Sequence, residues 1–238
     1  MRIVTLNTWK NDGDYMRRLE LMAASLRDLR ADAICLQECF TGGAADTAGH
    51  LACKLSMHAT QQPARAKLRM HEGGPILSTS GLAVLSRDRP TGADWLALTA
   101  DARDGERIAL RVDLACGLRI LNLHLTHLRD AAALRSVQLA EALAWARSGR
   151  SGPTMACGDL NCAQDDPEFA ALRAAAGEDP GPTLHAHRDR NGGRAIDHGV
   201  LVDPGGLSVR RRFLALQDAD ARGRFPSDHA AVVIDLDS

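Results

Sequence analysis

Polar side chains that could bind a cation or a phosphate group stand beside short apolar runs of this sequence. Asn7 follows the run RIVTL, and Glu38 closes the run ADAICLQE. Asp159 and Asn161 belong to GDLN, which follows another apolar run, and they share a face if the chain stays extended there. Because polar groups at the ends of rigid strands can converge on one cleft, these residues are candidates for a common site.

The rest of the chain carries further candidates of the same kinds. Asn122 and His124 are two residues apart, so they share one face of an extended segment. Asp197 lies within AIDHGVLV, and Asp228 and His229 precede the last apolar run. Carboxylate and amide oxygens suit a hard cation such as Mg²⁺ or Mn²⁺, which would polarise a phosphoryl oxygen. Imidazole and amide donors stabilise the charge that grows during in-line displacement, so the set indicates metal-assisted hydrolysis of a phosphate ester.

Each candidate by itself also has an ordinary structural interpretation. Asn7, Asp159 and Asp228 could be turn residues, Glu38 could face water, and His124 could be a hydrogen-bonded core imidazole. A zinc hydrolase is disfavoured because the nine histidines show no HExxH spacing. His185 and His187 would share a face and could line the rim of a site. Only the ordered set, taken together, favours the functional interpretation.

The elements that must position these residues follow from hydrophobic periodicity. Apolar residues recur at three and four positions from Met16 to Leu29 and again within about 130–147, which predicts two helices. Shorter helices are expected over 46–56 and from Pro167. Strands are expected over 2–6, 31–38, 81–86, 107–114, 118–125, 153–157, 195–202, 207–216 and 229–236, with surface loops at 57–80 and 217–227. Buried and alternating strands with helices at intervals fit two packed sheets with helices outside.

Composition sets the class of protein. The 238 residues, 45% of them hydrophobic and 25% charged, suffice for one large core, so we expect a single domain over 1–238. No run approaches the roughly 20 apolar residues of a membrane helix. The polar start, MRIVTLNTWK, does not fit a signal peptide, and we therefore expect a cytoplasmic protein. A net charge of −1 and 3% aromatic residues disfavour a non-specific nucleic-acid binder.

The motifs TLNTW, LQE, NLHL, GDLN, IDH and SDH, in this order, resemble those of the endonuclease/exonuclease/phosphatase superfamily. The resemblance runs from about residue 2 to residue 236, which is nearly the whole chain. It implies an α+β fold with four layers, an α/β/β/α sandwich of two stacked mixed sheets flanked by helices, as in pancreatic-type deoxyribonucleases. It also implies a divalent metal, usually Mg²⁺, in a cleft at one edge of the sandwich.

The same resemblance implies roles for the individual residues. Glu38 would be the principal metal ligand, with Asn7 beside it and Asp228 as a second contact. Asp159 would orient or deprotonate the attacking water. The phosphate would be held by Asn161 and His124 and by His229, which Asp197 would orient. Two further residues are candidates for substrate binding: Asn122, which shares a face with His124, and Arg65, from a basic loop that could instead simply be solvated.

The sequence therefore predicts a hydrolase, dependent on Mg²⁺ or Mn²⁺, that cleaves a phosphoester bond by in-line attack of an activated water. The expected substrate is a small phosphate ester, and the activity is that of a phosphodiesterase or phosphatase. Two alternatives stay open: a nuclease that acts on DNA or RNA ends, and a non-catalytic scaffold or binding module with the same fold. No obligate protein partner and no membrane span are expected.

Overall fold

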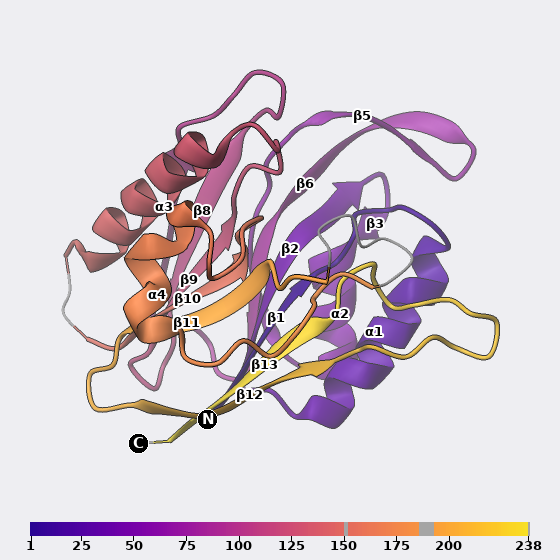
Figure 1. Ribbon diagram of the computed structural model, residues 1–238. Helices are drawn as coiled ribbons and strands as arrows, with labels where there is room; N and C mark the ends of the chain where they lie inside the picture. The colour runs from indigo at the N-terminus through magenta and orange to yellow at the C-terminus, as the bar shows by residue number, and fades with distance from the viewer. Residues whose placement is uncertain (150–151, 186–192, 238) are drawn as a thin grey trace.

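The computed structural model describes residues 1–149, 152–185 and 193–237, and it shows two packed β-sheets with helices on their outer faces (Figure 1). The first sheet has the strand order β12-β13-β1-β2-β6-β4, while β3 pairs with β2 and β5 with β6. Its strands are β1 (Arg2–Asn7), β2 (Ala33–Gly42), β3 (Ala45–Asp46), β4 (His58–Gln62), β5 (Lys67–His71), β6 (Gly74–Ser86), β12 (Ser208–Ala215) and β13 (Ala231–Asp237).

The second sheet has the strand order β11-β10-β9-β8-β7. Its strands are β7 (Gly92–Leu98), β8 (Arg107–Asp113), β9 (Arg119–His124), β10 (Thr154–Asp159) and β11 (Asp197–Asp203). Each sheet combines one parallel pair, β1 with β2 or β9 with β10, with antiparallel neighbours. The expectation of two mixed sheets is therefore confirmed.

Helices cover the outer face of each sheet, as Figure 1 shows. α1 (Tyr15–Leu29) and α2 (Thr47–Leu55) pack on the first sheet, and α3 (Ala132–Arg147), the short 3₁₀ helix η1 (Pro167–Phe169) and α4 (Ala170–Ala176) pack on the second. The side chain of Asp14 caps α1 by accepting from the backbone N–H of Arg17. No helix in the described ranges has the length and apolar character needed to span a membrane.

Three clusters of buried apolar residues separate the four layers. One lies between α1, α2 and the first sheet, and another lies between α3, α4 and the second sheet. The middle cluster joins the two sheets, with Ile3 and Val84 from the first and Ile120 and Met155 from the second. Burying apolar surface in this way is the main favourable contribution to folding. The predicted α/β/β/α sandwich is confirmed.

The segment 57–80 is not the surface loop that the sequence analysis expected. It holds β4, β5 and the first part of β6, and β5 pairs with β6 as a hairpin in the register Leu68↔Leu77. Both of these leucines are exposed, at 69% and 71% of their surface, whereas Ser78 and Ser80 are buried, so the hairpin lacks the buried apolar face by which a strand is normally recognised. β7 was also missed by the sequence analysis. By contrast, the expected loop 217–227 contains no regular element.

Candidate active site

The carboxyl ends of the parallel strand pairs meet where the two sheets face each other. Asn7 ends β1 and Asp159 ends β10, and the amide Nδ2 of Asn7 donates to Asp159 Oδ2 at 3.0 Å. This hydrogen bond joins the two sheets across 152 positions of sequence. The backbone N–H of Asn161 donates to the other oxygen, Asp159 Oδ1, at 3.0 Å. Asp159 is thus buried in a fixed orientation at the edge of the sandwich.

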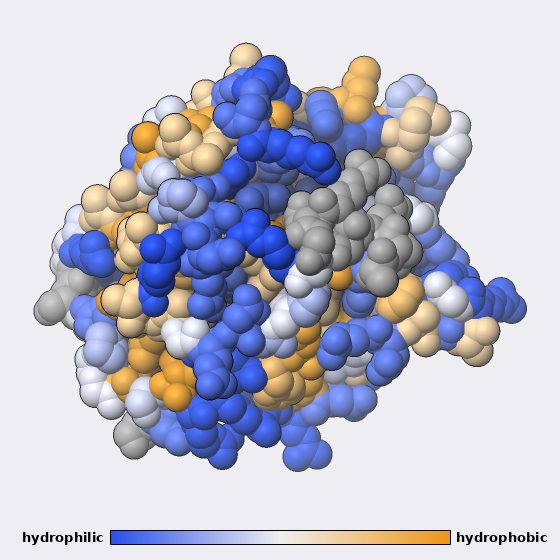
Figure 2. All heavy atoms as spheres, in the orientation of Figure 1, coloured by the Kyte–Doolittle hydropathy of each residue, from blue (hydrophilic) through white to orange (hydrophobic). Residues whose placement is uncertain are grey.

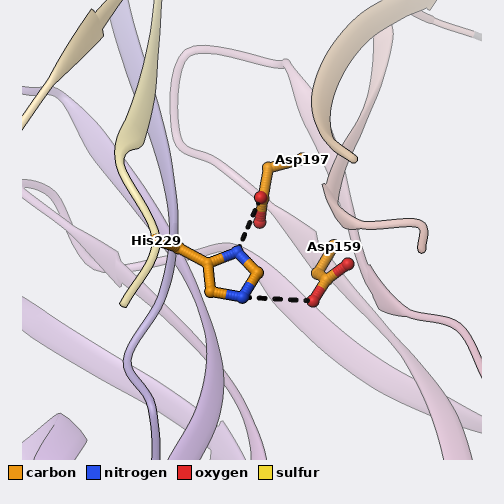
Figure 3. Close-up of side chains that lie close together, drawn as sticks. All are labelled: Asp159, Asp197 and His229. Atoms are coloured by element: carbon orange, nitrogen blue, oxygen red, sulfur yellow. Dashed lines mark hydrogen bonds and ion pairs between the residues drawn. The ribbon is translucent and has the colours of Figure 1, made fainter. Parts of the chain in front are cut away.

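His229 lies between two carboxylates from the second sheet (Figure 3). Its Nδ1 is 2.7 Å from Asp197 Oδ2, and because a carboxylate can only accept, Nδ1 carries the proton. Its Nε2 lies 4.0 Å from Asp159 Oδ2 and also 4.0 Å from Asp228 Oδ1. The hydroxyl of Ser227 donates to the backbone oxygen of Asn7 at 2.6 Å, which fixes this segment against β1. The imidazole is therefore held at one nitrogen and faces the site with the other.

Neighbouring charges set the proton affinities of this group. Burial lowers the pKa of His229, but Asp197, Asp159 and Asp228 outweigh it and raise that pKa to about 10. Burial and the nearby Asp197 raise the pKa of Asp159 well above that of an ordinary aspartate. Burial also raises the pKa of Asp228. The site therefore holds a cationic imidazole near neutral pH beside a carboxyl that can accept a proton there.

His124 adds a neutral imidazole to the site. Its Nε2 is 3.5 Å from Asp159 Oδ2, and its residue is 8% exposed. Burial, together with the positive charges of Arg107 and Arg65, lowers the pKa of His124 well below the usual value. The two histidines whose Nε2 atoms lie near Asp159 Oδ2 thus differ in charge, which lets His229 act as a cation and His124 as a neutral hydrogen-bonding group.

The sequence predicts that Glu38 ends its strand, but the strand runs past it. β2 continues to Gly42, and its register against β6 shifts between Leu36 and Cys39. At this β-bulge the backbone of Glu38 has φ 56°, in the left-handed region that non-glycine residues rarely adopt. Its carboxylate Oε1 lies 2.9 Å from the ammonium Nζ of Lys10. Such local strain is found where a side chain must be turned toward a functional site.

Asn161 and Asn122 differ from expectation in their geometry. Asn161 has φ 52°, so it is not on the extended face that it was expected to share with Asp159, and its Nδ2 donates to the backbone oxygen of Leu125 at 3.1 Å.

Asn122 is fully buried. Its Nδ2 donates to the backbone oxygens of Leu36 and Ala83, and its Oδ1 accepts from Gln37 Nε2. Asn122 therefore joins the two sheets, and the structure does not place it where substrate could reach it.

Asn122→Ala is expected to lower the free energy of unfolding by about 2–4 kcal/mol, because it leaves the amide of Gln37 and two carbonyl groups without this partner in the interior. Urea unfolding followed by circular dichroism measures the effect, with Gln217→Ala, which truncates an exposed amide side chain, as the control. Unchanged stability combined with a raised KM would restore the substrate-binding role that the sequence predicted.

Arg65 lies at a small pocket that also borders His124. Its Nη2 is 3.1 Å from Asp104 Oδ1, and Asp104 in turn receives two hydrogen bonds from Arg107, at 2.7 and 2.8 Å. Arg107 also donates to the backbone oxygen of His124 at 3.2 Å. The structure thus brings Arg65, the predicted substrate-binding residue, to the side of the site on which His124 lies.

One residue that the sequence analysis did not select, Arg18, supports the site, and one of the two expected rim histidines, His185, lies beside it. Arg18, fully buried on α1, donates to the backbone oxygens of Thr8, Trp9, Lys10, Asp12 and Pro226. It thereby fixes the loop after β1 and the segment before Asp228. An arginine within the apolar stripe of a helix was the available signal. The ring of His185 stacks on Phe225, and its backbone N–H donates to the oxygen of Asp228, while His187 lies outside the described residues.

The donor groups present fit a divalent cation. Asp159, Asp197 and His229 offer ligand atoms within 4.8 Å of one another. Two of these residues, Asp197 and His229, are already hydrogen-bonded to each other. The predicted ligands Asn7, Glu38 and Asp228 offer oxygen atoms, which hard cations prefer; Asn7 Oδ1 also accepts from the backbone N–H of Trp9, and Glu38 Oε1 pairs with Lys10. The negative charge of Glu38 contributes to raising the pKa of Asp228, so these carboxylates repel each other and a cation between them would relieve that repulsion.

Comparison with known proteins agrees with this geometry. No curated protein matches the chain. An endonuclease/exonuclease/phosphatase from Beutenbergia cavernae DSM 12333 is 22% identical with a TM-score of 0.75, over 99% of this chain and 71% of that chain. A mannosyl-6-phosphatase from Bacteroides thetaiotaomicron VPI-5482 is 17% identical with a TM-score of 0.74, over 100% of both chains. D. rerio TDP2, complexed with single strand DNA product, is 14% identical with a TM-score of 0.75, over 100% of this chain and 99% of that chain.

These identities are low, so the likeness of the three structures shows the shared fold. The sequence evidence is separate from it, because residues 4–229 match one family, and this range includes every predicted site residue from Asn7 to His229. The chain belongs to the Endonuclease/Exonuclease/phosphatase family.

Proposed function

We propose that this protein is a metal-dependent hydrolase of small phosphate esters, acting as a phosphodiesterase or phosphatase. Membership of the family supports the general class of phosphoester hydrolase. The observation that carries the proposal is the array in which Asp197 holds His229 at 2.7 Å and Asn7 holds Asp159 at 3.0 Å, with His229 Nε2 facing Asp159. A purely structural role does not require four polar side chains buried together at the edge of two sheets.

In the proposed reaction, the oxygen of a water forms a bond to phosphorus while the bond from phosphorus to the leaving ester oxygen breaks, and Asp159 accepts a proton from the attacking water. Burial and Asp197 raise its pKa toward neutral, which suits a general base, and Asn7 and Asn161 fix its two oxygens. His229 donates a hydrogen bond from Nε2 to a phosphoryl oxygen, because Asp197 occupies Nδ1 and keeps the ring protonated. His124, held neutral, binds another phosphoryl oxygen beside Asp159.

A divalent cation held by Glu38, with Asn7 and Asp228, would supply Lewis-acid polarisation of the phosphoryl group. Mg²⁺ and Mn²⁺ both suit this set of oxygen donors, and we propose one of them as the cofactor. The direct test is hydrolysis of bis(p-nitrophenyl) phosphate and p-nitrophenyl phosphate with added Mg²⁺, added Mn²⁺ or EDTA. We expect cleavage that depends on the metal. Absence of cleavage under every condition, with the same result for Asp159→Ala and His229→Ala, would favour a non-catalytic scaffold.

Glu38→Ala is expected to weaken Mg²⁺ binding by about tenfold or more without unfolding the chain. Among the described residues the carboxylate makes one ion pair, to Lys10, and it lies at the edge of the sandwich, so its loss leaves the three apolar clusters intact. Calorimetric titration with MgCl₂ measures the affinity, and Glu178→Ala, an exposed glutamate beyond α4, is the matched control. An unchanged Mg²⁺ affinity would remove Glu38 from the set of ligands.

A nuclease is the second candidate, favoured by the basic side chains Arg65, Lys67 and Arg69 beside the site. Binding to the backbone of a nucleic acid releases counterions, so the affinity of a nuclease for an oligonucleotide falls steeply with salt. A small phosphate ester releases few counterions. Titration of a short single-stranded oligonucleotide at low and at high salt therefore distinguishes the two candidates.

A further inference from the structure

Five basic side chains gather on one side of the reaction centre: Lys10, Arg65, Lys67, Arg69 and Arg107, which we call the basic cluster. Their proximity follows from shared contacts: Arg65 and Arg107 both pair with Asp104, Arg69 donates to the backbone oxygen of Arg65, and Lys67 lies two residues before Arg69 on β5. Burial lowers the pKa of Arg65, and the charge of Arg107 lowers it further. Burial also lowers the pKa of Lys67, with added contributions from Arg69, Arg65 and Lys10. Positive charges that repel one another in this way favour the binding of an anion between them.

The geometry of the basic cluster is fixed by the protein. Asp104, with a side chain that is 0% exposed, accepts two hydrogen bonds from Arg107 and also pairs with Arg65. Glu106 accepts the backbone N–H of Arg65 at 2.8 Å. Arg69 donates to Ser78, to Ser80 and to the backbone oxygen of Arg65. Guanidinium groups held in this way lose little conformational freedom when they bind a ligand.

Two members of the basic cluster, Arg65 and Arg107, line a small pocket next to the reaction centre. Ser80, His124 and Glu106 also line this pocket; the carboxylate of Glu106 is bound to the backbone N–H of Arg65, and His124 Nε2 is 3.5 Å from Asp159 Oδ2. Among the described residues, the guanidinium of Arg65 pairs through Nη2 with Asp104, and its Nε and Nη1 make no hydrogen bond to the protein. Hydrophilic side chains also gather at the centre of the face shown in Figure 2. Arginine donors in such a setting match the oxygens of a phosphate group.

Resting on the proposed function, we propose that Arg65 and Lys67, backed by Arg107, form a second phosphate subsite, so that the preferred substrate is a small molecule with two phosphate groups. One phosphate is bound by His229 and His124 for hydrolysis. The other is bound by the basic cluster and is not cleaved. Asp104 is a positioning residue, because it touches Arg65 and Arg107 and not the substrate.

The experiment compares two probes that differ by one phosphate: adenosine 3′,5′-bisphosphate and adenosine 5′-monophosphate. Each is titrated into the protein with excess Mg²⁺ by calorimetry, and each is tested as an inhibitor of bis(p-nitrophenyl) phosphate hydrolysis. We expect the bisphosphate to bind about tenfold or more tightly than the monophosphate. In Arg65→Gln/Lys67→Gln this ratio should fall to nearly one, whereas Arg147→Gln, an exposed arginine at the end of α3, should keep it.

Equal affinities for the two probes in the unaltered protein would overturn the second subsite. Because calorimetry needs no turnover, this result is separate from a failure of hydrolysis, which would overturn the proposed function instead. A single-stranded oligonucleotide provides the third arm. In one outcome, the oligonucleotide binds in a way that depends on Arg65 and Lys67 while the bisphosphate binds no more tightly than the monophosphate. That result would identify the basic cluster as a site for a nucleic-acid strand and would overturn the proposal.

Discussion

Asp159→Asn should reduce kcat for bis(p-nitrophenyl) phosphate by about 10²–10⁴-fold, the range that a general base contributes. The substitution keeps the size of the side chain and removes its ability to accept a proton. Both oxygens of Asp159 accept a hydrogen bond, one from Asn7 and one from the backbone of Asn161. In the variant, the side-chain NH₂ group that replaces one of these oxygens therefore also faces a hydrogen-bond donor. Steady-state kinetics with saturating Mg²⁺ measures the loss.

The matched control is Asp28→Asn, which removes an exposed carboxylate from α1 and should leave kcat unchanged. Circular dichroism of both variants establishes that the fold is retained. If Asp159→Asn kept kcat within about threefold of the parent value, Asp159 would not be the base, since general-base catalysis contributes at least about a hundredfold. The mechanism would then have to take its proton acceptor from elsewhere.

Asp197→Asn should reduce kcat by about 10²-fold and shift the alkaline limit of activity to lower pH. In the parent protein burial lowers the pKa of His229, but the surrounding aspartates, with Asp197 the largest contributor, raise it to about 10. His229 therefore stays protonated until the pH approaches that value. Without Asp197, less negative charge opposes the effect of burial, so the pKa of His229 falls. His229 then loses its proton, and with it the hydrogen-bond donor at Nε2, at a lower pH.

Profiles of kcat against pH, from about pH 6 to about pH 10, test this effect. A reduction in kcat that is equal at every pH would show that Asp197 does not act through the protonation of His229. Asp94→Asn, on the exposed strand β7, is the control for loss of a negative charge and should keep the parent profile. Its pairing with Arg111 is on the surface, where an ion pair contributes little to stability.

The sequence by itself determined the elements that carry the site. Short apolar runs predicted β1, β10 and β13, and the three- and four-residue spacing of apolar residues predicted α1, because these patterns depend on neighbours within a few positions. The same local reasoning failed at Met16, which was expected on the buried stripe and is 53% exposed. It failed also for the hairpin formed by β5 and the first part of β6, where Leu68 and Leu77 face solvent.

The tertiary structure decided which of the polar residues meet. Asn7 contacts Asp159 across 152 positions and His229 contacts Asp197 across 32, and no local pattern encodes such pairs. Asn122 and His124 lie on the same strand and both are buried. The side chain of Asn122 makes hydrogen bonds between the sheets, whereas that of His124 lies beside Asp159. The bulge that turns Glu38 also depends on the register of β2 against β6. Spacing along the chain fixes which face a residue occupies, whereas strand pairing and the packing of two sheets fix what lies opposite it.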